Sequence, residues 1–205
     1  MIGGLLFFSA GSFHYWQAWL LMAILFIPML GVGITLLVKN PELLKRRLEV
    51  KEKQVEQKYL INISGLMFVC GFVVAGLTFR WHGGMLPNWV SWLGTLLFLS
   101  AYLIYAEVLR ENRYLSRVVE VWEGQQVIDQ GLYGIVRHPM YSATLVLFLS
   151  IPLVLGSISS FIIFLVYPFI IAKRIQNEEQ VLEKKLKGYT AYQERVRYKL
   201  IPWMW

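Results

Sequence analysis

Residues 131–141 read GLYGIVRHPMY, and residues 142–171 continue as SATLVLFLSIPLVLGSISSFIIFLVYPFII. No Lys, Arg, Asp or Glu occurs after Arg137 in this stretch, which is long enough to enter a membrane. Arg137 and His138 therefore lie directly before an apolar segment. Because ionisable groups are costly beside a bilayer, we interpret this polar loop as part of a functional site.

Charged residues are scarce and clustered along the 205-residue chain. Only 16% of the residues are charged and 57% are hydrophobic, whereas soluble domains are usually about 45–50% apolar. Each uncharged stretch can hold at least one helical span of roughly 20 residues. Because these stretches are continuously apolar rather than alternating, they predict an all-α, multi-pass membrane protein and exclude a β-barrel. The stretches without Lys, Arg, Asp or Glu are residues 1–38, 59–79, 81–106 and 138–172.

Basic residues give the predicted orientation of the spans. Nineteen of the 20 Lys and Arg residues fall in residues 39–58, 110–139 and 173–205. These segments alternate with segments that are poor in positive charge. The positive-inside rule therefore predicts an N-terminus outside, with the C-terminus and the polar loop on the cytoplasmic side. The five predicted spans are residues 14–38, 59–79, 89–109, 140–156 and 158–173.

The last two predicted spans are short and share a turn near Gly156 and Ser157. Each arm would rise only about 24 Å, against a bilayer core of about 30 Å. We expect a short helical hairpin, whose arms Pro152 and Pro168 can kink. A single long tilted span is the alternative, and it would place the basic tail outside, against the charge bias.

Two segments beside the spans are also predicted to be helical. Asn40 as N-cap and Pro41 as the first helical residue predict a solvated cytoplasmic helix over residues 41–58. Apolar residues recur at helical spacing after the last span and predict a C-terminal amphipathic helix over residues 174–200. We divide the chain into N-terminal spans (1–110) and a C-terminal region (111–205) made of a loop (111–139), the hairpin (140–173) and the amphipathic helix.

Several common functional motifs are absent. The sequence has no dinucleotide-binding glycine fingerprint, phosphate-binding loop, metal-spaced Cys/His cluster or serine nucleophile elbow. We interpret Cys70 as a small buried hydrophobe and His14 and His82 as interfacial packing. Tryptophans near the span ends, Trp203 and Trp205 among them, are interpreted as an interfacial belt. The net charge of +7 follows from membrane topology, so we expect membrane lipids and no nucleic acid as partners.

Two polar blocks on the predicted cytoplasmic side carry the candidate chemistry. One is the loop 123–141, and the other begins where a charged helix leaves the last span, at KRIQNEEQVL (residues 173–182). Arg174 and Glu178 are spaced i, i+4 and share one helix face. A carboxylate at Glu178 suits a cationic ligand, and Arg174 suits a carboxylate or phosphate. The alternative from spacing alone is an ordinary ion pair on a surface helix.

The two blocks together resemble the isoprenylcysteine carboxyl methyltransferase family in its bacterial or archaeal type, within a wider group that includes phospholipid methyltransferases. RHPMY (137–141), preceded by GLY (131–133), is similar to the family signature. The resemblance covers roughly residues 105–200. The other matching positions are residues 111–116, residues 125–128, Arg174, Glu178, Glu179, Leu182, Tyr189 and Tyr192.

This resemblance implies a methyltransferase that uses S-adenosylmethionine, releases S-adenosylhomocysteine and has no Rossmann domain. Its cytoplasmic pocket would be covered by the loop and the C-terminal helix, and a lipophilic acceptor would enter from the bilayer. Arg174 would be catalytic and substrate-binding, His138 would be catalytic, and Arg137 would support the loop. The residues that would bind the cofactor are Gln125, Gln126, Val127, Ile128, Tyr133, His138, Pro139, Tyr141 and Glu178.

The implied chemistry uses no metal ion. Methyl transfer from a sulfonium is a direct displacement, and alignment of the reactants supplies most of the acceleration. A carboxylate acceptor is ionised at neutral pH and needs no general base, so isoprenylcysteine-type O-methylation is the reaction we expect. A phospholipid amine or a thiol is the alternative acceptor. An amine would have to lose a proton, and His138 or Glu179 could then serve as the base.

Two further functions fit parts of the sequence. Sterol reductases have a similar C-terminal helical arrangement and use NADPH, whose 2′-phosphate would require extra cationic residues; the loop 123–136 has no Arg or Lys. The other is a membrane protein without enzymatic activity, whose polar loop is structural. The sequence leaves open the acceptor, the oligomeric state and the role of the N-terminal spans.

Overall fold

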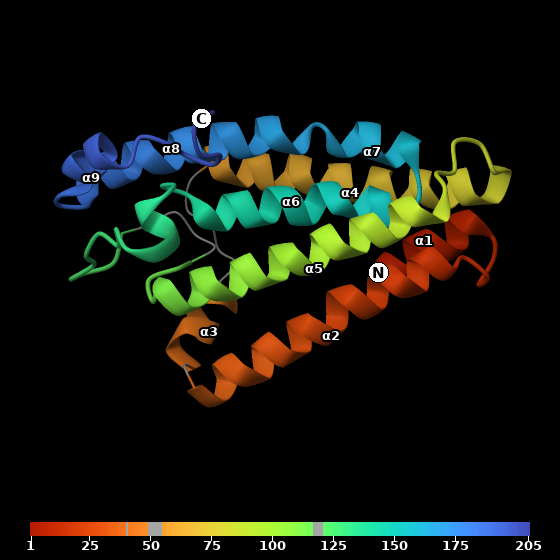
Figure 1. Cartoon of the computed structure of the whole chain (residues 1–205), viewed down its shortest axis with the longest axis horizontal. Helices are drawn as coiled ribbons and strands as arrows, with labels where there is room; N and C mark the ends of the chain where they lie inside the picture. Colours follow the sequence, from red (N-terminus) through yellow and green to blue (C-terminus); the bar gives the residue numbers. More distant parts are fainter. Residues whose placement is uncertain (40, 49–54, 117–120) are drawn as a thin grey trace.

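The computed structural model of the chain describes residues 1–39, 41–48, 55–116 and 121–205. This part is an elongated bundle of helices that run side by side (Figure 1). A 3-10 turn, η1 (Gly131–Gly134), precedes the second half of the bundle. The helices are α1 (Ile2–Ala10), α2 (Trp16–Lys39), α3 (Pro41–Leu48), α4 (Val55–Trp81), α5 (Asn88–Glu111), α6 (Pro139–Val154), α7 (Ile158–Phe164), α8 (Tyr167–Lys185) and α9 (Tyr189–Arg195).

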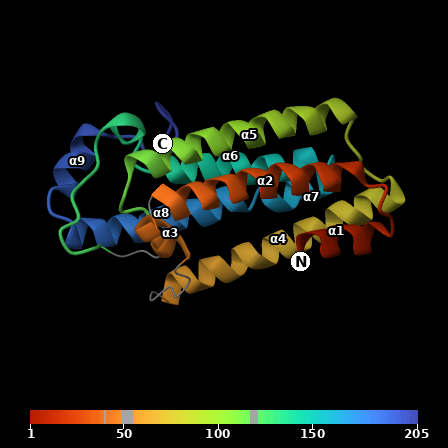
Figure 2. The same cartoon turned by 90° about the horizontal axis from the view of Figure 1, so that it is seen from below.

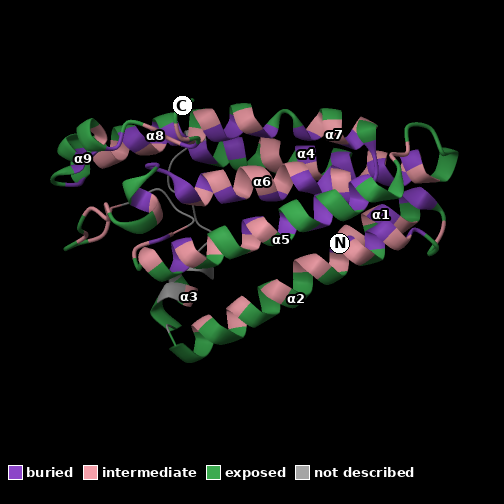
Figure 3. Ribbon diagram, in the orientation of Figure 1, coloured by how far each residue is buried: buried purple, intermediate pink, exposed green. Residues whose placement is uncertain are grey.

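Four helical segments in the described part are long and apolar enough to cross a membrane. They are Trp16–Lys39, Gln57–Trp81, Asn88–Glu111 and Ile158–Lys185, and the shorter apolar helix Pro139–Val154 accompanies them. The predicted all-α, multi-pass membrane fold is therefore confirmed. Little of α2 is buried (Figure 3), and its side chains are mostly apolar, as expected for a helix that faces lipid.

The predicted hairpin is present, and the alternative of one long tilted span is wrong. Gly156 adopts φ +67°, and its carbonyl accepts a hydrogen bond from the Leu86 amide at 2.8 Å. After this turn, α7 packs back against α6. The charged helix predicted to continue out of the last span is present, because α8 runs past Lys173 to Lys185. The break between α7 and α8 comes just before Pro168, which occupies the first turn of α8, where its missing N–H leaves no intrahelical bond unmade.

Other local predictions differ from the structure. The C-terminal helix predicted over 174–200 is interrupted and ends earlier: α8 ends at Lys185, and α9 (Tyr189–Arg195) begins after Gly188, whose φ of +86° turns the chain. Cys70 is exposed on α4 rather than buried. Helix α1 was not predicted, since nine residues are too short for a span.

The predicted helix over residues 41–58 corresponds to α3 and the start of α4, and residues 49–54 between them lie outside the described residues. The N-cap predicted at Asn40 lies outside them as well. The structure therefore supports a helix in the first and the last part of residues 41–58.

Close helix contacts depend on glycines. A Cβ added to Gly94 of α5 would lie 2.7 Å from the Val154 amide nitrogen of α6, and one added to Gly76 of α4 would lie 2.7 Å from the Leu6 carbonyl oxygen of α1. These neighbours are backbone atoms, which cannot turn aside as side chains do. Small residues of this kind let membrane helices approach closely.

We expect Gly94→Ala to destabilise the protein, because α5 and α6 must move apart, at a cost of about 1–3 kcal/mol. The measurement is the thermal unfolding midpoint in detergent. The control is Gly65→Ala in α4, where a Cβ would meet nothing within 4 Å and alanine favours the helix. Equal midpoints for the two variants would contradict the close packing of α5 on α6.

The polar segments gather at one end of the bundle. The segment before α6, together with α9 and the C-terminal part of α8, lies at the end opposite to α1 (Figures 1 and 2). Segments far apart in sequence thus meet where the apolar helices end.

Candidate functional site

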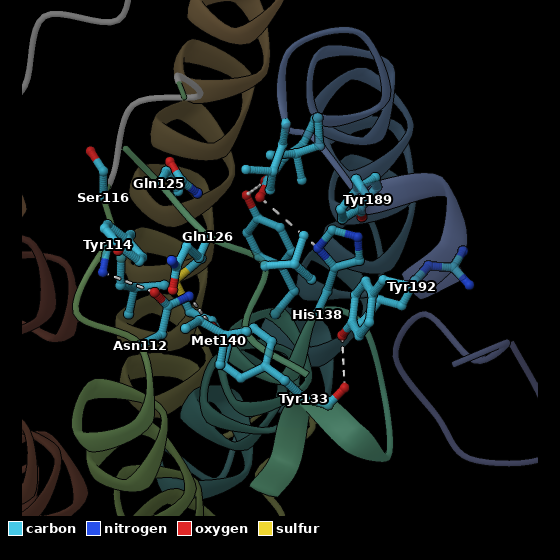
Figure 4. A pocket seen from close by; sticks show the side chains of 18 of the residues that line it. Asn112, Tyr114, Ser116, Gln125, Gln126, Tyr133, His138, Met140, Tyr189 and Tyr192 are labelled. Carbon is cyan, nitrogen blue, oxygen red and sulfur yellow. Dashed lines mark hydrogen bonds and ion pairs between the residues drawn. The ribbon is translucent and has the colours of Figure 1, made fainter. Parts of the chain in front are cut away.

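A cavity of about 840 Å³, counted out to its open mouth, lies at this end of the bundle. Figure 4 shows Asn112, Tyr114, Gln125 and Gln126 on one side and His138 with the α9 tyrosines on the other. The lining residues are Asn112, Tyr114, Leu115, Ser116, Gln125, Gln126, Val127, Ile128, Tyr133, Arg137, His138, Met140, Tyr141, Arg174, Glu178, Leu182, Leu186, Tyr189 and Tyr192.

A chain of polar contacts joins α6 to α8 in the cavity wall. The Tyr141 hydroxyl donates a hydrogen bond to Glu178 Oε2, and it accepts one from Arg174 Nε at 2.9 Å. Glu178 Oε1 also lies 4.0 Å from His138 Nδ1. The side chain of Glu178 is about a quarter exposed, so its carboxylate is fixed by neighbours and still open to a ligand. A carboxylate in this position can bind a cation or a pair of hydroxyls.

The next residue, Glu179, points away from the cavity and holds three donors. Its Oε1 accepts from Arg137 Nε at 2.7 Å and lies 3.2 Å from His138 Nε2, and its Oε2 lies 2.9 Å from Lys199 Nζ. Arg137, His138 and Glu179 are each less than 10% exposed. The ionised Glu179 can only accept, so His138 donates through Nε2 and turns Nδ1 towards Glu178. The adjacent glutamates thus face different partners.

The loop before α6 is fixed to the end of α5. Both carboxylate oxygens of Glu111 accept from the Leu132 amide, at 3.1 and 3.0 Å. Asn112 Nδ2 donates to the Tyr133 hydroxyl at 2.8 Å. From the other side, the Tyr192 hydroxyl donates to the Tyr133 carbonyl at 2.7 Å. These bonds place Tyr133 between α5 and α9.

Gly131 makes this arrangement possible, and we expect Gly131→Ala to disrupt it. The residue has φ +58°, and an added Cβ would lie 1.8 Å from Glu111 Oε1, which holds the Leu132 amide. The matched control is Gly124→Ala, where φ is +73° and the Cβ would meet nothing. Both variants share the backbone strain, so the excess destabilisation of Gly131→Ala, about 1–3 kcal/mol, measures the clash. Equal thermal midpoints would show that Glu111 does not fix the loop.

Tyr189 is a buried phenol in the cavity wall whose hydroxyl has no hydrogen-bond partner among the described residues. Burial, together with the negative charges of Glu179 and Glu178, raises the pKa of Tyr189 above its usual range. Burial likewise raises the pKa of Tyr192. Both phenols are therefore neutral at physiological pH. A buried hydroxyl without a hydrogen bond costs free energy, and a ligand in the cavity can supply the missing bond to Tyr189.

The structure brings most of the sequence-predicted site residues to one cavity. Arg174, His138 and eight of the nine predicted cofactor residues line it; the exception is Pro139, which is buried in the first turn of α6. Arg137 also lines the cavity, and its Nη1 donates to the carbonyls of Val196 and Arg197. Among the described residues, no group of three His, Cys, Asp or Glu side chains is arranged for a metal ion.

Sequence analysis did not assign several lining residues to the site. Leu182 and Tyr189 were matched to the family without a role in the pocket, and Leu186 was interpreted only as part of an apolar helix face. The place of Tyr189 in the wall depends on the turn at Gly188. Met140 is within the signature, yet its side chain was given no role. The others are Asn112, Tyr114, Leu115, Ser116 and Tyr192. Residues 111–116 were matched to the family as a segment, and this match was the signal that could have indicated a wall.

Comparison with known families adds an independent observation about this part of the chain. Residues 89–188 match the phospholipid methyltransferase family. This region runs from α5 to the turn before α9, and it contains all the lining residues except Tyr189 and Tyr192. The match supports the wider group in the sequence resemblance and, with the membrane fold, a membrane methyltransferase.

One curated relative comes from another class. The Delta(14)-sterol reductase of Mus musculus is 31% identical over 85 residues, which are 40% of this chain and 20% of the reductase. The chain therefore spans about a fifth of the length of this relative. Such a partial match indicates a shared segment.

Proposed function

We propose that this protein transfers a methyl group from S-adenosylmethionine to a lipophilic acceptor held in the membrane. The observation that carries the proposal is Glu178: a half-buried carboxylate, fixed by Tyr141, opens into a polar and aromatic cavity within the region matched to phospholipid methyltransferases. The cavity lies where the apolar helices end, so a lipid could reach it from the bilayer and the cofactor from water.

The donor set fits the chemical groups of this cofactor. Glu178 can pair with the ammonium of the methionine part, and the amides of Gln125 and Gln126 can bond polar edges of the base or ribose. The ring of Tyr133 and the apolar side chain of Ile128 offer surfaces for adenine. The unpartnered hydroxyl of Tyr189 can bond a ligand oxygen. When bound, the cofactor supplies an activated methyl group on a sulfonium.

Arg174 is the residue we assign to the acceptor. Its Nε is held by the Tyr141 hydroxyl, and the planar guanidinium suits a carboxylate. We therefore propose a carboxylate acceptor, as in isoprenylcysteine-type O-methylation. The protein then contributes alignment and exclusion of water. For an amine or thiol acceptor, His138 can take a proton at Nδ1, whereas Glu179 is occupied by Arg137 and Lys199.

The charge pattern supports the orientation proposed from the sequence. The cavity lies at the end of the bundle that carries the described parts of the basic segments 110–139 and 173–205, so we place it on the cytoplasmic side, with the N-terminus outside. S-adenosylmethionine would then be taken from the cytoplasm.

The test is transfer of a labelled methyl group from S-adenosylmethionine in proteoliposomes. Farnesylated N-acetylcysteine and phosphatidylethanolamine would be supplied as acceptors, since a methyl ester is base-labile and an N-methyl group is stable. We expect base-labile label from the prenylcysteine. Stable label in phosphatidylethanolamine would replace the carboxylate with an amine. Absence of transfer and of S-adenosylhomocysteine binding by folded protein would overturn the proposal.

The Arg174→Gln variant tests the role of this residue in the same assay. We expect transfer to fall by about 10- to 100-fold, because a charged hydrogen bond to the acceptor is lost, with cofactor binding less affected. The control is Lys173→Gln, which removes the neighbouring exposed cation. Equal activity of the two variants would contradict an acceptor role for Arg174.

An NADPH-dependent reductase is the second candidate, and the partial match to the mouse sterol reductase is the observation that favours it. The absence of Arg and Lys from the loop 123–136 weighs against a 2′-phosphate site there. Titration with NADPH beside S-adenosylhomocysteine distinguishes the two. Saturable binding of NADPH alone would favour the reductase.

A further inference from the structure

The segment 196–200 runs beside the first residues of the signature at the start of α6. The amide of Arg137 donates to the carbonyl of Tyr198 at 2.9 Å, and the amide of His138 donates to the carbonyl of Lys199 at 2.9 Å. Two consecutive amides of the loop are thus bound by the C-terminal segment. The backbone of His138, which lines the cavity, depends on this pairing.

Side chains fasten the same segment to the bundle. Lys199 Nζ lies 2.9 Å from Glu179 Oε2 on α8, and the Ser142 hydroxyl of α6 donates to the Leu200 carbonyl at 2.6 Å. Leu200 is buried in the main apolar cluster. The segment therefore bridges α6 and α8 beside the cavity.

After Leu200 the chain folds into a tight aromatic turn. The Trp205 amide donates to the Ile201 carbonyl at 3.1 Å, and the Leu200 amide donates to the Trp205 carbonyl at 2.9 Å. Trp203 adopts φ +64°, which a residue with a side chain seldom does, and it projects outwards. Trp203 is 85% exposed and Met204 is 78% exposed. We name residues 201–205 the aromatic turn.

The aromatic turn lies at the level where the apolar surface ends. The Leu200 carbonyl accepts from Ser142 in the first turn of α6, and Lys199 pairs with Glu179, which follows the first charged residues of α8. The two views together place the C-terminal end near the start of α6 (Figures 1 and 2). Helix α6 carries no charged residue, and exposed apolar side chains such as Phe169 of α8, at 76% exposure, belong to the surface that faces lipid. Lys199 Nζ lies 5.3 Å from the Trp205 ring centre, which places a cation beside the aromatic group.

We propose that the aromatic turn is an anchor in the interface of the bilayer, and that it holds the segment 196–200 against the loop of Arg137 and His138. Tryptophan beside lysine is the composition that interfaces favour, because the ring is apolar and its N–H and the ammonium reach water. The occupant of this surface is the lipid interface, since the turn follows Leu200, which is bonded to the first turn of α6, where the uncharged run 138–172 begins. Contact with lipid thereby stabilises one wall of the cavity.

The depth of the aromatic turn is tested with spin labels in nanodiscs of phosphatidylcholine and phosphatidylglycerol. The label is placed at Trp203→Cys in a Cys70→Ala background, with Phe169→Cys as lipid reference and Lys187→Cys as water reference. Collision rates with oxygen and with a water-soluble nickel chelate are compared. We expect position 203 to favour oxygen, closer to 169 than to 187. A pattern equal to that at 187 would overturn the anchor.

The hold on the loop is tested by hydrogen exchange of the Arg137 and His138 amides. The Trp203→Ser/Met204→Ser variant should exchange there about tenfold faster in nanodiscs, because local opening becomes easier. The conservative Trp203→Phe/Met204→Leu variant should stay near wild type. Unchanged exchange in the serine variant would overturn the coupling.

Neither readout uses a ligand, so both stand if the proposed methyl transfer fails. Only a third readout rests on the proposed function. If the protein binds this cofactor, the Trp203→Ser/Met204→Ser variant should bind S-adenosylhomocysteine more weakly in nanodiscs than the Trp203→Phe/Met204→Leu variant.

Discussion

Replacing Glu178 by glutamine is expected to weaken binding of S-adenosylhomocysteine by about 10- to 100-fold, the usual worth of a charged hydrogen bond. The substitution keeps the shape of the side chain and an oxygen that can accept from Tyr141, and it removes the negative charge that faces the cavity. The measurement is calorimetric titration of the purified protein in detergent.

Two comparisons make the Glu178 result interpretable. Glu183→Gln changes an exposed glutamate on the same helix that accepts from Gln193, and it should bind the ligand as wild type does. The thermal midpoint of Glu178→Gln should stay close to that of wild type, since the side chain is partly exposed. Unchanged affinity in a folded variant would remove Glu178 from the cofactor site.

Replacing Glu179 by glutamine is expected to affect mainly stability, whereas Glu178→Gln affects mainly ligand binding. The free energy of unfolding should fall by about 3–5 kcal/mol. The variant leaves the guanidinium of Arg137 buried without its counter-ion and removes the charge that pairs with Lys199. For a chain of this size, such a loss lowers the thermal midpoint by about 10 °C. Ligand affinity should fall as well, because His138 loses its orientation.

The control for Glu179 is an exposed ion pair at the same end of the molecule. Asp129 Oδ2 lies 2.7 Å from Arg195 Nη2, with both side chains at least a third exposed. Exposed pairs contribute about 0–1 kcal/mol, so Asp129→Asn should change the midpoint little. A similar small change for Glu179→Gln would mean that its three contacts do not hold the C-terminal segment.

The contrast between Glu178 and Glu179 marks a limit of sequence reasoning. Neighbouring helical residues point about 100° apart, so the sequence indicates that only one of them can share the face of Arg174. Which one opens to the cavity follows from that rule. The contacts of the other glutamate with Arg137, His138 and Lys199 do not follow from the rule, because those partners come from distant segments.

The hairpin shows a similar division. The length of the uncharged run predicted two short arms around Gly156, and the structure confirms the turn. The sequence also predicted that a charged helix continues out of the last span, and α8 runs past Lys173 and Arg174; its end at Lys185 was not predicted. Charge marks where a bilayer ends, and a helix whose face packs on the protein need not end there.

The sequence by itself determined that this is an all-helical membrane protein and which polar blocks face its candidate site. The length of the apolar stretches and the clustering of charge can be seen in the sequence alone, and they decide which segments can cross a bilayer. Only the tertiary structure decided that α9 and the segment 196–200 complete the cavity wall and fix its loop. Those contacts depend on turns at Gly131 and Gly188 and on hydrogen bonds between residues about 60 positions apart, which no local pattern encodes.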